Sequence, residues 1–212
     1  MRMRKKKHRE ERLEACENII VYELSEYKDD LKKLFDNDNP IHLELGCGKG
    51  KFISELAMKN PDINYFAFEK NKDVLILAAE KIKNLNLKNV KFFCGNAMVL
   101  NEIETKTKCA RIYINFCDPL PNRGKRKQRL THHRFLDIYK KLISDNGEIF
   151  FKTDNRPLFE FSLNSFADYG LRLRNITLDL HNSDYEGNIM TEYETLFSEQ
   201  GMPIYRCEAV FE

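Results

Sequence analysis

The chain has 212 residues, of which 42% are hydrophobic and 32% charged, and its net charge at pH 7 is +2. This length and composition suit one globular domain, or one domain with a short extension. Apolar runs are only a few residues long and the cysteines form no CxxC pair, which argues against a membrane span, a signal peptide and a metal site and predicts a cytoplasmic protein.

The N-terminal segment is strongly basic. Residues 1–12 (MRMRKKKHREER) contain seven Lys or Arg. Such a terminus is most often a solvated, mobile tail, but a second basic cluster at residues 123–129 raises the alternative of a nucleic-acid partner. A helix is expected near residues 26–35. We predict a basic extension with a lead-in helix at 1–35 and the main domain at 36–212.

From residue 41 onward, predicted strands alternate with predicted helices. The first strand and its glycine turn lie at 41–50, and further strands are predicted at 63–70, 90–97, 110–118 and 148–155. Between them we predict a helix that follows the glycine turn and ends before Pro61, and helices at 72–84 and 134–143. A helix at 158–170, a strand at 172–181, a loop at 182–201 and an antiparallel edge strand at 203–211 follow. The order predicts an α/β, doubly wound, mostly parallel seven-stranded sheet with ligands at the carboxyl ends of its strands.

The first strand runs into a glycine turn, LELGCGKG. Gly46 and Gly48 follow Glu44 closely, and a generic tight turn is the simplest interpretation. The spacing lacks the GxxG ending of the dinucleotide fingerprint, and a pyrophosphate would be repelled by Glu44, whereas a zwitterionic or cationic ligand would not.

Two further polar residues end the next strands. Glu69 could accept both hydroxyls of a ribose, and Asn96 could offer its amide to an adenine edge or to a group on the ribose side. Together with Glu44 and the glycine turn, this pattern favours S-adenosylmethionine over a dinucleotide as cofactor. Taken singly, Glu44 and Asn96 could each be an exposed cap.

The fourth predicted strand ends at Asp118, within NFCDPLPNRGKRKQR. An Asx turn before Pro119 is one interpretation of this acid. DPLP is also similar to the Asn/Asp-Pro-Pro-aromatic motif of amino-group methyltransferases, but Leu120 replaces the second proline and the base-stacking aromatic is missing. The five basic residues that follow, from 123 to 129, should attract polyanions.

The motifs LELGCGKGKF, FAFEK, NFCDPLP with its basic loop, FFKTDN and NIMTEYETLFSEQG together resemble those of the bacterial tRNA (guanine-N7-)-methyltransferases over roughly residues 40–212. The resemblance implies a Rossmann-like class I methyltransferase fold in the domain at 36–212. It also implies methyl transfer from S-adenosylmethionine, leaving S-adenosylhomocysteine, to N7 of the variable-loop guanine in tRNA, with no metal and with the protein a monomer or a homodimer.

The same resemblance implies roles for individual residues. It gives cofactor contacts at Glu44, Gly46, Gly48, Glu69, Asn96 and Asp118, with Asp118 also catalytic. It gives substrate contacts at Asn122, Asp154, Thr191, Glu192, Tyr193 and Glu194. It gives RNA contacts at Arg123, Gly124, Lys125, Arg126, Lys127, Gln128 and Arg129. The chain departs from the family pattern DPWPKKRH, with Leu120 for tryptophan, Asn122 for lysine and Gly124 for a basic residue.

Guanine N7 carries a lone pair and no proton, so methyl transfer to it needs no general base. Asp118 is expected to orient the base and stabilise its developing positive charge. Thr191 and Glu194 also fit a capping box at the start of a solvated helix. An amino-group methyltransferase and a non-catalytic RNA-binding module are the alternative functions.

Overall fold

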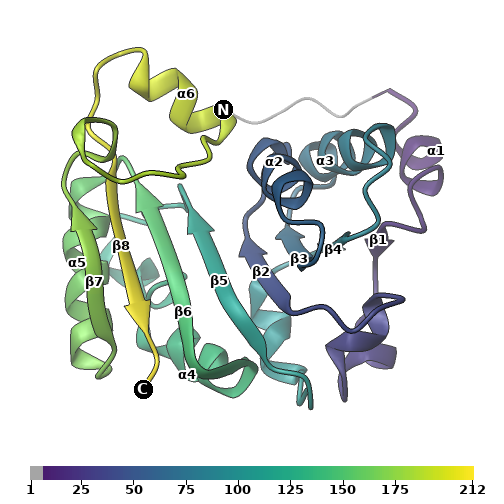
Figure 1. Cartoon of the computed structure of the whole chain (residues 1–212), viewed down its shortest axis with the longest axis horizontal. Helices are drawn as coiled ribbons and strands as arrows, with labels where there is room; N and C mark the ends of the chain where they lie inside the picture. The colour runs from purple at the N-terminus through teal and green to yellow at the C-terminus, as the bar shows by residue number, and fades with distance from the viewer. Residues whose placement is uncertain (1–6) are drawn as a thin grey trace. The chain divides into compact units, whose positions relative to one another are not determined.

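The computed structural model describes residues 7–212, which form two compact units that divide between Thr107 and Lys108 (Figure 1). Each unit contributes four strands, so the described residues hold eight strands and not the seven predicted. The additional strand is β1 (Ile20–Val21), which pairs in parallel with β4 (Val90–Cys94). A strand of two residues is too short to show the alternation that reveals strands in a sequence.

The first unit is built on a parallel sheet with the strand order β1-β4-β3-β2. Strand β2 (Ile41–Leu45) is buried at every residue, and β3 (Asn64–Glu69) at all but its last. Such continuous burial is typical of parallel strands covered on both faces. Helices α2 (Lys51–Lys59) and α3 (Lys72–Asn84) follow β2 and β3, as the sequence predicts. The register pairs Leu45 with Phe68 and Glu69 with Cys94, so the carboxyl ends of the strands lie together.

The prediction of a lead-in helix near residues 26–35 is wrong, because the segment forms no α-helix. The segment forms two short 3-10 turns, Ser25–Tyr27 and Leu31–Leu34. Its backbone groups bond outside a helix: Leu31 N–H donates to Thr105 Oγ1 at 3.0 Å, and the carbonyl of residue 28 accepts from Glu104 N–H at 2.8 Å. These bonds with residues 104–105 replace the ones that an α-helix would need.

The basic N-terminal segment is ordered over part of its length, contrary to the expectation of a solvated tail. Helix α1 (Arg9–Glu14) buries Leu13, and Arg12 donates two hydrogen bonds to the Glu80 carboxylate of α3, at 2.6 and 2.7 Å. A buried leucine and a bidentate ion pair thus fix α1 on the first unit. The predicted tail residues 1–6 lie outside the described residues.

The second unit has the strand order β5-β6-β8-β7. Strands β5 (Cys109–Asn115) and β6 (Ile143–Thr153) are parallel, and β8 (Tyr205–Val210) is antiparallel to both β6 and β7 (Arg172–Thr177). Helices α4 (His133–Leu142) and α5 (Arg156–Asp168) cover one face of this sheet (Figure 1). The antiparallel pairing of the last strand is confirmed, but its place at the sheet edge is wrong, because β7 is outermost.

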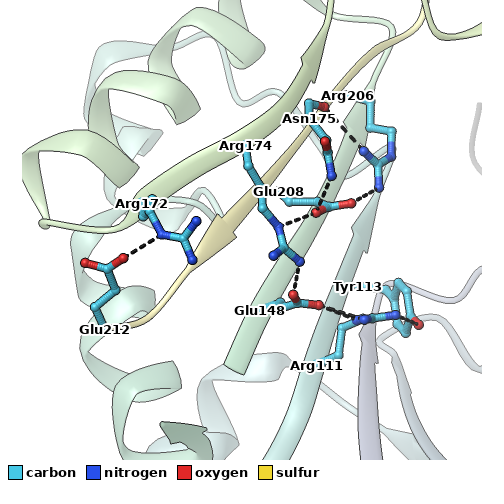
Figure 2. A network of polar contacts seen from close by, with 9 residues as sticks. All are labelled: Arg111, Tyr113, Glu148, Arg172, Arg174, Asn175, Arg206, Glu208 and Glu212. Carbon is cyan, nitrogen blue, oxygen red and sulfur yellow. Dashed lines mark hydrogen bonds and ion pairs between the residues drawn. The ribbon is translucent and has the colours of Figure 1, made fainter. Parts of the chain in front are cut away.

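Cross-strand ion pairs explain why polar residues occur inside this sheet. Arg174 of β7 bonds to Glu208 of β8 at 2.7 Å and also to Glu148 of β6, which accepts from Arg111 of β5 at 2.7 Å (Figure 2). Arg206 pairs with Glu208 along β8. The mixed pattern of β8 therefore reflects charges that pair with neighbouring strands and not a solvent-facing edge.

The chain between β7 and β8 is more structured than the loop predicted at 182–201. The strand ends at Thr177, a 3-10 turn follows at Leu180–Asn182, and helix α6 spans Glu192–Ser198. Among residues 7–212, no helix combines the length and apolarity that a membrane crossing requires.

Candidate functional site

The glycine turn in the first unit leaves β2 and closes back onto the end of β3. Gly46 N–H and Cys47 N–H both donate to the Phe68 carbonyl, at 2.9 and 3.0 Å. Gly46 and Gly48 have φ values of +88° and +57°, which favour glycine. A Cβ atom at either position would meet nothing within 4 Å, so the space beside this turn is open.

Glu69 at the end of β3 is bonded to the glycine turn. Its carboxylate accepts from Gly48 N–H at 3.2 Å and from Asn71 N–H at 2.8 Å. Burial raises the pKa of Glu69 above its usual value, although these two backbone hydrogen bonds act in the opposite direction. A half-buried carboxylate fixed in this way is suited to accept hydrogen bonds from a pair of hydroxyl groups.

The other two candidates of the first unit differ from each other in exposure. Glu44 is only 1% exposed within β2, so it is no exposed cap. Asn96 is exposed, and its Oδ1 accepts from Met98 N–H at 2.9 Å, capping a 3-10 turn at Ala97–Glu102. The capping interpretation of Asn96 is therefore confirmed, and its Nδ2 group is a donor that the cap does not use.

These features suit S-adenosylmethionine at the glycine turn. The open space beside Gly46 and Gly48 gives room for a ligand against the backbone, and the carboxylates of Glu44 and Glu69 match a ligand with a positive charge and a ribose diol. Among residues 7–212, no group of three or more His, Cys, Asp or Glu side chains could hold a metal ion.

In the second unit, Asp118 lies beyond the strand on which the sequence places it. β5 ends at Asn115, Phe116 N–H donates to the Lys152 carbonyl at 2.9 Å, and Phe116 then adopts a φ of +51°. An aromatic residue in this left-handed region is uncommon and typical of functional loops. The exposed Asp118 side chain therefore sits on a constrained loop between β5 and the prolines.

The basic loop that follows is a 3-10 turn, Arg123–Gln128, and residues 121–128 are all exposed. Its cationic side chains lie at the surface and not in the core, and they are therefore suited to contacts with phosphates. Arg129 is different, since it is 6% exposed, donates to the carbonyls of Pro119 and Leu120 at 2.9 and 3.3 Å, and lies 4.4 Å from the Phe161 ring centroid. Arg129 therefore holds the loop that carries Asp118, and only a small part of its side chain is accessible for the predicted RNA contact.

The predicted substrate residues of the TEYE segment fall into an exposed and a buried group. Tyr193 is 49% exposed, its ring centroid lies 5.6 Å from that of Phe116, and burial together with the nearby Asp154 charge raises its pKa. Thr191 and Glu192 are half-buried beside it. The segment thus brings Tyr193 to the ends of β5 and β6, where Phe116 and Asp154 lie.

Glu194 is fully buried, so the helix start is capped as predicted, but this side of its first turn is buried while Tyr193 is exposed. Its backbone N–H donates to Thr191 Oγ1 at 2.9 Å, which completes the capping box with the Glu194 carboxylate. The carboxylate also accepts from Lys152 Nζ at 2.7 Å and from Asn188 Nδ2 at 2.7 Å. These bonds show that Glu194 is held inside the protein.

Lys152 and Phe116 are the residues that the sequence analysis missed. Lys152 belongs to the FFKTDN motif, two positions before Asp154, but a lysine inside an apolar strand gives no indication of its partner 42 residues away. Phe116 looked like one more core residue of the fourth strand, and only its positive φ distinguishes it.

Comparison with known proteins gives close relatives. Residues 38–207 match a family model described as "Putative methyltransferase". Curated tRNA (guanine-N(7)-)-methyltransferases from Clostridioides difficile and Bacillus licheniformis are 50% and 48% identical, over 217 and 209 aligned residues. In both cases the match covers 99% of this chain and 98% of the relative.

Solved structures with low sequence identity share the fold. The 16S rRNA methyltransferase KamB matches 91% of this chain and 95% of its own, with a TM-score of 0.65 and 11% identity. The plantazolicin methyltransferase BamL, solved with a triazolic desmethylPZN analog and SAH, matches 84% of this chain and 79% of its own, with a TM-score of 0.52 and 16% identity. The predicted Rossmann-like methyltransferase fold is confirmed.

Proposed function

The chain belongs to the tRNA (guanine-N(7)-)-methyltransferase family, and we propose that it transfers the methyl group of S-adenosylmethionine to N7 of a guanine in tRNA. The observation that carries this proposal is the 48–50% sequence identity to two of the family's curated members over nearly the whole chain. The proposed target is the guanine of the variable loop. The proposed location is the cytoplasm, where tRNA is found. The proposed oligomeric state is a monomer or a homodimer.

The first unit supplies the proposed cofactor residues. Glu69 accepts the ribose hydroxyls, Asn96 offers Nδ2 to the adenine side, and Glu44 balances the positive charge of the ligand. Gly46 and Gly48 leave the backbone open to it. S-adenosylmethionine supplies an electrophilic methyl group on a positively charged sulfur, and these residues bind and orient it.

The second unit supplies the proposed guanine residues. Asp118, on its constrained loop, fixes the base in line with the methyl donor and stabilises the positive charge that develops on the ring. Asp154, Thr191 and Glu192 provide polar groups for the donors of guanine. The exposed Tyr193 ring offers a surface on which the base can stack, a contact worth about 1–3 kcal/mol.

The basic loop 123–128 is proposed to hold tRNA phosphates. Drawing a guanine out of a folded tRNA costs a few kcal/mol, by analogy with base flipping, and phosphate contacts help to offset it. Arg123, Lys125, Arg126 and Lys127 carry the charge, while Gly124 and Gln128 shape the exposed turn. Asn122, at its start, can offer only a neutral contact where the family pattern has lysine.

The test is incubation of unmodified tRNA with labelled S-adenosylmethionine, followed by nucleoside analysis. We expect 7-methylguanosine, and a methylated amino group would instead support the alternative reaction.

Asp118→Asn should lower kcat far more than it weakens tRNA binding, because it removes charge and leaves the phosphate contacts intact. Equal turnover by this variant would refute the role of Asp118.

A further inference from the structure

Two buried cations lie side by side at the carboxyl end of β6. Lys152 of β6 is paired in register with Arg206 of the antiparallel strand β8. Their exposed fractions are 5% and 2%, so neither cation is solvated by bulk water. Buried charges of the same sign must be compensated by acids and carbonyl groups.

The groups that compensate Lys152 come from the segment 188–194, whereas Arg206 pairs with Glu208 of β8 and donates to the Asn175 carbonyl of β7 at 3.3 Å. Lys152 Nζ donates to Asn188 Oδ1 at 3.0 Å, to the Ile189 carbonyl at 2.9 Å and to Glu194 Oε2 at 2.7 Å. The guanidinium of Arg206 stacks on the Tyr185 ring, 3.6 Å from its centroid. The two cations together therefore hold residues 185–194 against the sheet.

The contacts of Lys152 form a closed ring and not a single ion pair. Asn188 accepts from Lys152 through Oδ1 and donates through Nδ2 to Glu194 Oε1 at 2.7 Å. His181 Nε2 lies 3.4 Å from the same carboxylate oxygen. A network whose members are all bonded has one preferred arrangement, and the network fixes the backbone at residues 188, 189 and 194.

We propose that Lys152 is a positioning residue for methyl transfer. It holds the segment 188–194 at the end of β6, and thereby sets Thr191 and Tyr193 beside Asp154, two residues further along the same strand. This inference rests on the proposed function, in which these three residues meet the guanine. Lys152 itself is 5% exposed and acts through the segment.

The variants are chosen to separate positioning from stability. Lys152→Met removes the cation and its three hydrogen bonds at similar length, but leaves the Glu194 carboxylate buried without its ammonium partner. The double variant Lys152→Met/Glu194→Gln removes both charges, which relieves that cost while the bonds of Nζ stay lost. Arg172→Met is the control, because it breaks an ion pair on the same sheet, with Glu212 at 2.5 Å, that is bonded neither to Arg206 nor to the segment.

We expect Lys152→Met to lower kcat about 100-fold, as for a misplacement near 1 Å, with little change in KM for tRNA. Turnover is expressed per site that binds S-adenosylhomocysteine in calorimetry, so that unfolded protein is not counted. The double variant should regain melting temperature and still turn over slowly, and Arg172→Met should keep the wild-type kcat. If the double variant regains both, or if Lys152→Met keeps its kcat, Lys152 has no positioning role.

Hydrogen exchange provides an independent readout. Peptides covering residues 185–194 should exchange faster in the Lys152→Met variant than in the wild type, and unchanged exchange would overturn the proposal. Asn188→Ala, which removes one link of the ring and leaves the ion pair, keeps the test possible if Lys152→Met does not fold. It should lower kcat in the same direction, and unaltered kcat would count against the ring. A wild-type protein that makes no 7-methylguanosine would refute the proposed function, while the exchange result still decides whether Lys152 holds the segment.

Discussion

The backbone conformation of individual glycines determines whether the turn after β2 has room for a ligand. Gly48 has a φ of +57°, and a Cβ at this position would meet nothing within 4 Å. Gly50 has a φ of +80° for a different reason, since its Cβ would lie 2.8 Å from Ala78 Cβ in α3. Gly48 therefore faces open space and Gly50 permits helix packing, although the two residues look equivalent in the sequence.

We predict that Gly48→Ala weakens S-adenosylmethionine binding beyond its effect on stability. The left-handed φ costs alanine roughly 1–2 kcal/mol, and the new methyl group occupies space proposed for the cofactor. Gly170→Ala is the matched control, because Gly170 has a φ of +85° and equally open surroundings at the end of α5. Both variants should melt at lower temperature, but calorimetry should find weaker cofactor binding only for Gly48→Ala. Equal affinity in the two would contradict the proposed place of the cofactor.

The roles of individual charged residues were the hardest to predict from the sequence. Arg129 belongs to the same basic run as Lys125, yet its guanidinium is bonded to the Pro119 and Leu120 carbonyls. Glu194 stands beside Tyr193 in TEYE, yet one is fully buried and the other half exposed. Sequence gives the charge of a residue, whereas burial and hydrogen bonds depend on contacts between distant segments.

At the level of elements, the basic loop 123–128 is the part of the second unit suited to phosphate contact. All six residues are exposed, and the turn is short, so its cations lie close together. Helix α1 contains basic residues too, but Arg12 is already paired with Glu80. Among the described residues, helix α1 therefore differs from the loop 123–128 in the charge that it can offer to RNA, because Arg9 and Arg12 are both paired with acids.

We predict that Lys125→Gln/Lys127→Gln lowers the salt dependence of tRNA binding. The slope of log Kd against log salt should fall by about 0.7–0.9 for each phosphate contact that is lost, because fewer counterions are released on binding. The control is Lys140→Gln/Lys141→Gln, which removes two exposed charges at the end of α4. Filter binding from low to high salt would measure both slopes. A loop variant with the slope of the control would show that the loop makes no phosphate contacts.

Helices and strands with a strong hydrophobic periodicity were predicted correctly. Elements that form only through hydrogen bonds with distant segments were not. Helix α3 spans Lys72–Asn84, the range that its apolar spacing predicts. The lead-in helix failed because residues 28 and 31 bond to residues 104 and 105, and β1 was missed because two residues form it by pairing with β4. Segments whose backbone bonds go to distant parts of the chain carry no local signal of their structure.

Across the whole molecule, the proposed roles divide between the two units. Glu44, Glu69 and Asn96 belong to Met1–Thr107, whereas Asp118, Asp154 and the TEYE segment belong to Lys108–Glu212. This division was not predicted from the sequence, which indicated one domain at 36–212 and placed a cofactor contact at Asp118 as well. The ring of contacts around Lys152 lies within the second unit and is built from residues far apart in sequence, so the motifs alone did not reveal it.

The division of roles predicts that defects in the two units add. Glu69→Gln should weaken cofactor binding and leave the Kd for tRNA unchanged, while Lys125→Gln/Lys127→Gln should do the reverse. Sites without shared partners usually combine within about 0.5 kcal/mol, so the triple variant should lose rate, at low cofactor and low tRNA, by the product of the separate factors. Initial rates over a matrix of both concentrations would measure this. The altered residues are assigned to separate ligands. If the loss of rate in the triple variant differs from the product by well over that margin, cofactor binding and tRNA binding are energetically coupled, and the division of roles is wrong.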